Sequence, residues 1–219
     1  GLWSTANNTI ATINAVTGLV TGVNPGTTTL TYTFTNANGC TNSVSTNFTV
    51  NALPAAVITA NGTTTFCQGG SVTLLAANAP SGSTFVYQWR LNGTAIVGAT
   101  ANTYVATASG NYSVTITANG LCQATSANTN LVVYPLPTVA ALTGATNVCS
   151  GSTTQLASAT TGGVWTSSDA SIATVSTSGV VTGVTAGSAT ITYTVTNGNG
   201  CSSAVTATVN VNSGATATI

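Results

Sequence analysis

The sequence has almost no charged side chains. Its 219 residues include one basic side chain, Arg90, and one acidic side chain, Asp169, with no histidine, lysine, glutamate or methionine. General acid–base catalysis needs titratable groups, and Ser or Cys nucleophiles need an adjacent base. Zinc sites need sets of Cys and His, and calcium sites normally include carboxylates. We therefore expect a protein that is not an enzyme, with no catalytic residue, no metal site and no cofactor.

The shortage of basic residues also bears on possible partners. A surface that follows a phosphate backbone needs clustered Lys and Arg, so we expect no nucleic-acid partner. Hydrophobic residues make up 43% of the chain, but no apolar run is long enough to cross a bilayer, and we expect no membrane span. No signal peptide is visible. A targeting signal, if the protein has one, is expected outside these residues.

Helical patterns are missing as well. Thr, Val, Ser, Ala and Asn dominate the sequence, and Thr and Val favour strands over helices. Alternation of polar and apolar residues is clear in 29–35, 113–118 and 189–196. Short strands separated by Gly, Asn and Pro predict an all-β sandwich fold.

The chain repeats itself at intervals of about 80 residues. Residues 1–40 match residues 163–201, with Trp3 at the position of Trp165. The unit between them has a different sequence but keeps the spacing of the cysteines. Prolines at the junctions indicate short, stiff linkers. The predicted boundaries are 1–52, 53–136, 137–213 and a final segment 214–219.

The middle unit carries three stretches of a known pattern. These are "GGSVTLLA" (69–76), "YQWRLNGTAI" (87–96) and "ASGNYSVTI" (108–116). They resemble strands B, C–C′ and F of an immunoglobulin domain, of an I-set or PKD-like kind. The resemblance places Trp89 at the buried tryptophan and Tyr112 at the tyrosine corner.

The middle unit departs from this family at one pair of positions. The two inter-sheet cysteines of an immunoglobulin domain would fall at Ala76 and Val114. The usual disulfide is therefore missing from this unit.

The outer units resemble the bacterial Ig-like group 2 family. The residues that carry this resemblance are 163–194, "GVWTSSDASIATVSTSGVVTGVTAGSATITYT", and their copy at 1–33. Such domains occur in long extracellular adhesins. The alternation of unit types, with "CQGGSVTL" and "NGC", is similar to very large secreted surface proteins of Bacteroidota, including gliding-type adhesins exported by the type IX pathway.

The two resemblances together imply a fold and a location. The implied fold is all-β, with tandem immunoglobulin-like β-sandwiches in a head-to-tail array. Residues 1–52 would be a repeat that lacks its first strands, and residues 214–219 would begin a next repeat or a linker. The implied location is extracellular, either on the cell surface or secreted.

The aromatic residues recur at fixed positions of the repeats. We expect Trp3, Trp89, Trp165 and Tyr112 to be core or corner residues of the sandwiches rather than a platform for sugars.

The five cysteines fall into two classes. Cys67 and Cys149 come just before the second strand of a unit, whereas Cys40, Cys122 and Cys201 follow the last hairpin of a unit. Regular spacing in a protein of this kind predicts disulfides and an oxidising compartment. Metal binding would call for closer CxxC clustering, which is absent.

Two pairings are open. Pairing within each domain would join Cys67 to Cys122 and Cys149 to Cys201. Strand directions place Cys67 and Cys122 at opposite ends of a sandwich, roughly 20 Å apart, whereas a disulfide spans a Cα separation of at most ~7 Å. In a head-to-tail array Cys67 would instead lie near Cys201. We favour this inter-domain pair, with Cys40, Cys122 and Cys149 paired with residues outside the chain.

The low charge also bears on assembly. Thr, Ser and Asn hydrate a surface but give no like-charge repulsion between neighbouring copies. The sequence therefore predicts the structural shaft of an extracellular bacterial adhesive fibre or surface filament for cell–cell or cell–surface attachment, formed by self-association into a homo-oligomeric fibre or bundle. One alternative is a glycan- or protein-binding Ig-like module of a monomeric adhesin. Another is a set of spacer repeats in a large secreted enzyme. A cell-surface or glycan target would bind at a tip outside these residues.

Overall fold

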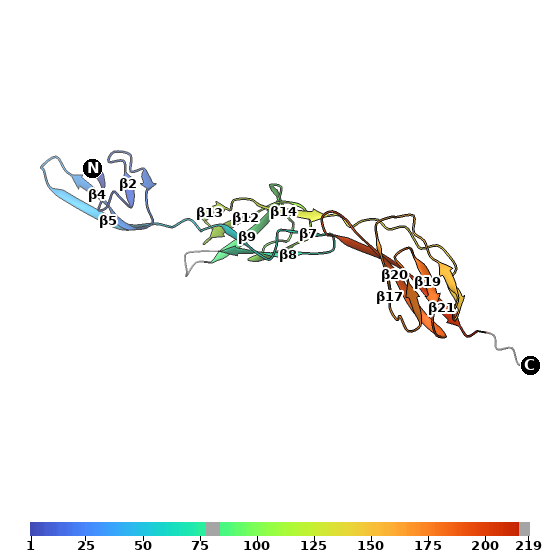
Figure 1. The fold of residues 1–219 in the computed structure, drawn as a ribbon. Coiled ribbons are helices and arrows are strands. Elements are labelled where there is room, and N and C mark those ends of the chain that lie inside the picture. Colours follow the sequence, from blue (N-terminus) through green and yellow to red (C-terminus); the bar gives the residue numbers. More distant parts are fainter. Residues whose placement is uncertain (78–83, 215–219) are drawn as a thin grey trace, which may run out of the picture. The chain divides into compact units, whose positions relative to one another are not determined.

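All regular structure in the described residues is β-strand (Figure 1). The computed structural model describes residues 1–77 and 84–214. Its strands form several sheets, organised as immunoglobulin-like β-sandwiches in tandem along the chain, and the predicted fold class is confirmed. The predicted last segment, 214–219, lies outside the described residues from residue 215 onward. Over the described ranges we find no helix with the length and apolarity required to cross a bilayer.

The chain divides into two compact units. One consists of Gly1–Thr64 and Ser71–Leu131, and the other consists of Thr65–Gly70 and the residues from Val132 onward. The second unit is therefore discontinuous in sequence. Its short segment Thr65–Gly70 lies within the middle repeat of the sequence but belongs to the same compact unit as the C-terminal repeat.

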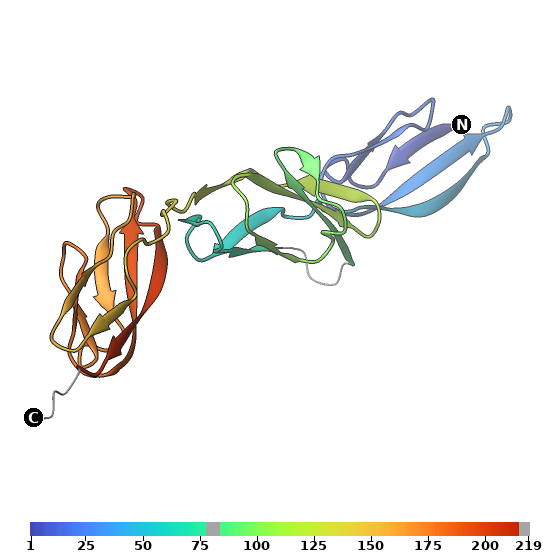
Figure 2. The ribbon, with the colours of Figure 1, turned by 90° about the vertical axis from the view of Figure 1, so that its right-hand side faces the viewer.

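The C-terminal repeat is a sandwich of two sheets (Figure 2). The first sheet has the order β15-β21-β20-β17, formed by Asn147–Cys149, Ser202–Asn212, Gly187–Thr196 and Val164–Ser167. The second has the order β16-β19-β18, formed by Thr153–Gln155, Val180–Gly183 and Ala173–Val175. The first strand, β15, runs parallel to the end of β21, and the other pairings are antiparallel.

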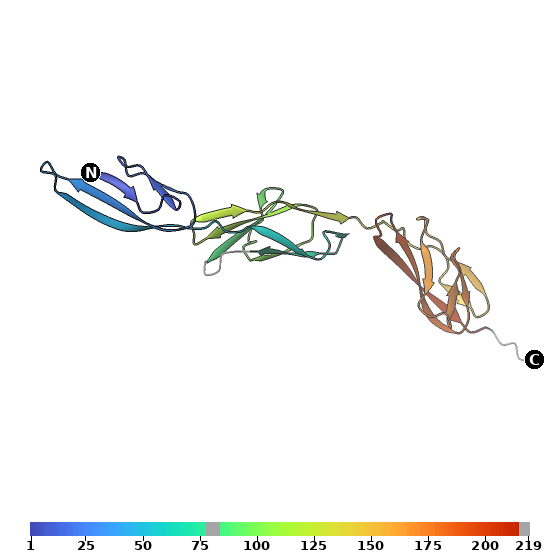
Figure 3. The same cartoon turned by 60° about the vertical axis from the view of Figure 1, so that its left-hand side comes forward.

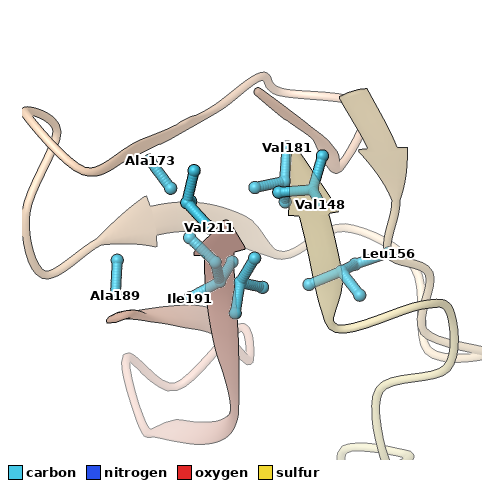
Figure 4. Packing of buried hydrophobic residues seen from close by; sticks show 8 residues of the cluster. Val148, Leu156, Ala173, Val181, Ala189, Ile191 and Val211 are labelled. Atoms are coloured by element: carbon cyan, nitrogen blue, oxygen red, sulfur yellow. The ribbon is translucent and has the colours of Figure 1, made fainter. Parts of the chain in front are cut away.

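Alternation along the strands produces the core of this repeat. On β20 every second residue from Ala189 to Val195 is buried, because successive side chains point to opposite faces of a sheet. Side chains from both sheets meet between the layers (Figure 4). The buried cluster consists of Val148, Leu156, Ala173, Val181, Ala189, Ile191, Val209 and Val211. Full burial of a Val, Leu or Ile side chain contributes about 1.5–3 kcal/mol, so this cluster dominates the stability of the repeat.

The N-terminal repeat has a smaller set of strands. One sheet has the order β1-β4-β5, with β4 and β5 as a long antiparallel ribbon (Figure 3), and β2 pairs with β3. The bounds are Leu2–Thr5 for β1, Ala11–Ile13 for β2, Val20–Gly22 for β3, Gly26–Thr35 for β4 and Thr41–Val50 for β5. They match β17, β18, β19, β20 and β21. No described strand of this repeat corresponds to β15 or β16. Val20 is accordingly half-buried, whereas the matching Val181 is fully buried.

The middle repeat also has two sheets. One has the order β11-β8-β6, formed by Thr103–Ala106, Val72–Ala77 and Val57–Asn61. In the other, β12 (Gly110–Ala118) pairs with β9 (Phe85–Leu91) and β13 (Cys122–Thr125), and β10 (Thr94–Ala95) pairs with β9. The last strand, β14 (Thr129–Tyr134), pairs through its first half with β12 and through its second half, in parallel, with β7 (Thr65–Cys67).

Two aromatic residues anchor the middle core. Trp89 is completely buried, and its indole N–H donates to the carbonyl of Ala101 at 2.9 Å. The hydroxyl of the buried Tyr112 donates to the carbonyl of Ala108, four residues upstream, at 3.1 Å. This bond is the one that defines a tyrosine corner. Burial raises the pKa of the Tyr112 phenol.

Apolar packing occupies the place of the usual inter-sheet disulfide in this repeat. Ala76 on β8 and Val114 on β12 are both buried, with 1% and 0% of their surface exposed. These positions therefore contribute to the core without a covalent link between the sheets.

Candidate functional site: the Cys67–Cys201 junction

Cys67 and Cys201 are joined by a disulfide. The S–S distance is 1.98 Å, the Cα atoms are 5.6 Å apart, and the two residues are separated by 134 positions in sequence. Both lie in the second compact unit, and Cys201 is fully buried. The bond links a segment of the middle repeat to the last hairpin of the C-terminal repeat.

The other three cysteines carry free thiols in the structure. Cys40 and Cys149 are exposed, and Cys122 is half-buried. The two intradomain pairs considered from the sequence, Cys67 with Cys122 and Cys149 with Cys201, are not formed. Pairing of Cys40, Cys122 and Cys149 with residues outside the chain stays a prediction.

Parallel strand pairing positions Cys67. It is the last residue of β7 and stands opposite Tyr134 at the end of β14. The next residue, Gln68, donates its backbone N–H to the carbonyl of Tyr134 at 2.8 Å, and Gly70 donates to the carbonyl of Cys67 at 2.9 Å. The turn requires a positive φ of 92° at Gly69, which glycine adopts without a steric penalty. The backbone around Cys67 is therefore fixed on both sides.

An asparagine turn positions Cys201. The Oδ1 atom of Asn197 accepts the backbone N–H groups of Asn199 at 3.0 Å and of Cys201 at 3.1 Å. The same side chain donates through Nδ2 to the carbonyl of Pro135 at 2.9 Å. Pro135 directly follows β14, which pairs with β7. One asparagine thus shapes the turn that presents the cysteine and also holds the linker beside it.

The disulfide provides a covalent path for tension that avoids the residues between Cys67 and Cys201. A force entering the chain before Cys67 and leaving it after Cys201 passes through two sulfur atoms instead of through the residues between them. Those residues include most of the middle repeat and most of the C-terminal repeat. The junction can therefore protect folded sheets from unravelling under tension.

Trp3 and Trp165 are half-buried. The ring of Trp165 packs against the core cluster and lies 4.5 Å from the ring of Tyr193, and Trp3 lies 4.9 Å from Tyr32 in the N-terminal repeat. A shallow hollow beside Trp165 is also lined by Leu156.

The Tyr193 hydroxyl beside this hollow is already engaged. The hydroxyl of Tyr193 donates to the carbonyl of Thr160 at 2.9 Å and accepts the backbone N–H of Gly163 at 2.8 Å. No charged side chain lines the hollow. The hollow therefore has few of the directed polar groups that orient a ligand.

The two charged side chains hold local structure. The guanidinium of Arg90 donates to the hydroxyl of Thr115 and to the carbonyl of Gly93, both at 3.2 Å. The carboxylate of Asp169 accepts the hydroxyl of Ser171 at 2.6 Å and its backbone N–H at 2.9 Å. These bonds, led by the one from the Ser171 hydroxyl, lower the pKa of Asp169. Within the described ranges, no group of three or more His, Cys, Asp or Glu side chains could hold a metal ion.

Replacing Asp169 by asparagine is expected to leave the fold intact and to remove an acid-dependent loss of stability. Asn7, at the matching position, makes the same two bonds to Thr9, at 2.9 and 2.7 Å. Because the pKa of Asp169 is lowered in the folded protein, its carboxylate favours folding above its unfolded pKa, and this contribution is lost as the pH falls through the folded pKa.

Denaturant unfolding between pH 2 and 6 would test this expectation on the C-terminal repeat. The matched control is Asn7→Asp, which should introduce the same acid dependence into the N-terminal repeat. An Asp169→Asn protein whose stability still falls with acid to the same extent would contradict the assignment.

Comparison with known proteins supports an Ig-like fold for the C-terminal repeat. Residues 133–209 match the family model described as Bacterial Ig-like domain (group 2). No curated protein matches the chain. The matched range covers β15 to β20 and most of β21 and includes Cys201.

Several solved structures share a similar arrangement of strands. The insect immune protein hemolin is 15% identical, with a TM-score of 0.37, and the match covers 84% of this chain and 56% of hemolin. A Ca²⁺-stabilized adhesin that helps an Antarctic bacterium to reach out and bind ice is 14% identical, with a TM-score of 0.40 and coverage of 87% and 58%. A 1.5-MDa bacterial ice-binding adhesin is 13% identical, with a TM-score of 0.36 and coverage of 90% and 79%. The chain spans less than two thirds of the first two, and likenesses this distant carry no argument about function.

Sequence reasoning missed two parts of the junction. It did not predict that Thr65–Cys67 pairs in parallel with Val132–Tyr134, nor that Asn197 bonds to the linker. A signal for the second was present. Asn36 and Asn197 each stand four residues before a cysteine, which is the spacing at which the side chain caps the turn.

Proposed function

We propose that the chain is part of the structural shaft of an extracellular bacterial surface filament or adhesive fibre that attaches cells to surfaces or to one another. The observation that carries the proposal is the disulfide between Cys67 and Cys201. It links the middle repeat to the last hairpin of the C-terminal repeat, across a sequence separation of 134. A disulfide that encloses folded sheets helps them to resist tension and proteolysis. Such bonds form in oxidising compartments.

Two further features support this role. The match of residues 133–209 to a bacterial Ig-like family supports a bacterial surface protein as the parent. With one Arg and one Asp engaged in local turns and no other charged side chain, the residue inventory favours a mechanical role over catalysis. The proposed parent is a large secreted surface protein of the kind that Bacteroidota export by the type IX pathway.

The experiment is a pair of substitutions in the full-length gene of the source organism, Cys201→Ser and, as the matched control, Cys122→Ser. Immunogold labelling with an antibody to this chain should mark material outside the cell in both strains. The Cys201→Ser cells should detach from a surface at lower shear in a flow chamber, because tension then reaches the sheets between Cys67 and Cys201. Label confined to the cell interior, or equal detachment of the two strains, would contradict the proposal.

We also propose that copies of the shaft associate side by side. The near absence of charge leaves little repulsion between neighbouring copies, and little for salt to screen. With all free thiols alkylated, static light scattering at high protein concentration should show the same oligomer at low and at high salt. A monomer under all these conditions would contradict lateral association. It would not bear on the proposed role of the disulfide.

A further inference from the structure

The sequence contains six asparagines that are followed directly by glycine. They are Asn38, Asn61, Asn92, Asn119, Asn197 and Asn199. Deamidation starts when the backbone nitrogen of the next residue attacks the side-chain amide carbon, and glycine favours this approach because it has no Cβ and a flexible backbone. The sequence alone therefore offers six candidate sites for deamidation. The hydrogen bonds of the fold distinguish between them.

In two of these Asn-Gly pairs the attacking nitrogen is already bonded. The backbone N–H of Gly39 donates to the carbonyl of Asn36 at 3.0 Å. In the matching turn, the backbone N–H of Gly200 donates to the carbonyl of Asn197, also at 3.0 Å. Each turn must open before its glycine nitrogen can attack, so the folded protein protects both pairs.

In three more pairs the asparagine side chain is held. Asn197 makes the three side-chain bonds described above. The Oδ1 atom of Asn92 accepts the backbone N–H of Asn111 at 2.9 Å. The Oδ1 atom of Asn119 accepts the backbone N–H of Thr84 at 3.0 Å. Attack at any of these side chains would break bonds that the fold makes, so local opening must come first.

Asn61 has neither form of protection. It is the exposed last residue of β6, where it pairs with Thr73. Within the described residues, no hydrogen bond engages its side-chain amide or the backbone N–H of Gly62. The next strand, β7, begins at Thr65, so the residues between the two strands belong to no sheet. At this pair, neither the attacking nitrogen nor the amide has to give up a bond before the reaction.

We propose that Asn61 is the modification site at which the folded chain deamidates, with water as the reactant and aspartate and isoaspartate as the products. The proposal does not depend on the role as a shaft. The change is large for this molecule, because it adds one negative charge to a chain that has a single acidic side chain and a formal net charge of zero. It also falls between β6 and β7, and Cys67 is the last residue of β7. An isoaspartate there would lengthen the main chain just before the disulfide.

The reaction needs no reagent other than water. The backbone nitrogen of Gly62 loses its proton to hydroxide and attacks Cγ of Asn61. A C–N bond forms, and the side-chain nitrogen takes up a proton and leaves as ammonia, which gives a cyclic imide. Water then adds to one of the two ring carbonyls and breaks its bond to the ring nitrogen. Opening at Cγ gives aspartate, and opening at the backbone carbonyl gives isoaspartate. In total, one water is consumed and one ammonia is released.

The test is incubation of the folded 219-residue chain at mildly alkaline pH, followed by isoelectric focusing and by peptide mapping with mass spectrometry. Because the chain has so little charge, each deamidation shifts its isoelectric point and can be counted. The unchanged chain should form an acidic species with aspartate or isoaspartate at position 61. Asn61→Gln should lose this species, since the longer glutamine side chain closes a ring far more slowly. The matched control, Asn199→Gln, should keep it.

The other five pairs should react about tenfold or more slowly than Asn61 in the folded chain, because each must first open. In concentrated guanidinium chloride the six pairs should react at similar rates. Four results would overturn the inference. They are an equal amount of the acidic species from Asn61→Gln, deamidation of the folded chain mainly at another pair, no acidic species from the folded chain, and a preference for Asn61 that persists in guanidinium. None of them bears on the shaft proposal, which depends on the location of the chain and on Cys201.

Discussion

Reducing the Cys67–Cys201 disulfide is expected to add about 450 Å to the length that the chain reaches when it is pulled from its two ends. With the bond intact, tension runs through the residues before Cys67, through the two sulfur atoms and through the residues after Cys201. The segment between them, which spans a sequence separation of 134, carries no force. At roughly 3.3–3.6 Å per extended residue, its release accounts for the gain.

Single-molecule force spectroscopy with and without reductant would measure this difference. Cys40, Cys122 and Cys149 should be replaced by serine throughout, so that only the Cys67–Cys201 bond responds to the reductant. The oxidised molecule should show unfolding only of structure that involves the residues before Cys67 and after Cys201, and the reduced molecule should show additional events from the enclosed residues. Equal total extension in the two states would mean that the bond does not divert the force.

Replacing Trp89 by alanine is expected to lower the free energy of opening of the middle repeat by about 3–5 kcal/mol, the usual cost of truncating a fully buried tryptophan. Its ring is completely buried, lies 5.9 Å from the ring of Tyr104 and has its N–H bonded to Ala101. The substitution therefore leaves a cavity and an unpaired carbonyl. The effect should be local to the middle repeat.

Hydrogen exchange of the β12 amides, followed by mass spectrometry, would report this opening. The matched control is Trp165→Ala, since Trp165 occupies the C-terminal repeat and is half-buried. It should cost less and should leave the exchange of β12 unchanged. A Trp89→Ala protein with β12 exchange close to that of the unchanged chain would show that the middle sandwich does not depend on this residue.

The all-β fold was predictable because the strand alternation and the motif resemblances in the sequence both indicate β-sandwiches. Strand alternation in Gly187–Thr196 produces a strand whose alternate residues are buried, and the stretch around Tyr112 forms the corner bond that the family resemblance implies. These features depend on residues close in sequence or on a strongly repeated pattern. A single chain without an alignment is sufficient to find them.

Tertiary detail was harder to obtain from sequence. Trp3 and Trp165 are half-buried, and how much of each ring is exposed depends on how the neighbouring loops close. The place of Thr65–Gly70 in the second compact unit depends on three parallel residue pairs, Val132–Tyr134 with Thr65–Cys67. Parallel pairing between distant segments leaves no turn signal in the sequence, because the two strands are not joined by a hairpin.

The central claim is that the disulfide joins Cys67 to Cys201, and a double digest tests it most directly. Trypsin can cleave this chain only after Arg90, and a protease specific for aspartate can cleave it only before Asp169. After alkylation without reduction and then denaturation, the two cuts give pieces 1–90, 91–168 and 169–219. The account predicts that 1–90 and 169–219 stay linked while 91–168 is released. A complex of all three pieces held by Cys67–Cys122 and Cys149–Cys201 links would contradict it and would make each repeat an independently closed bead.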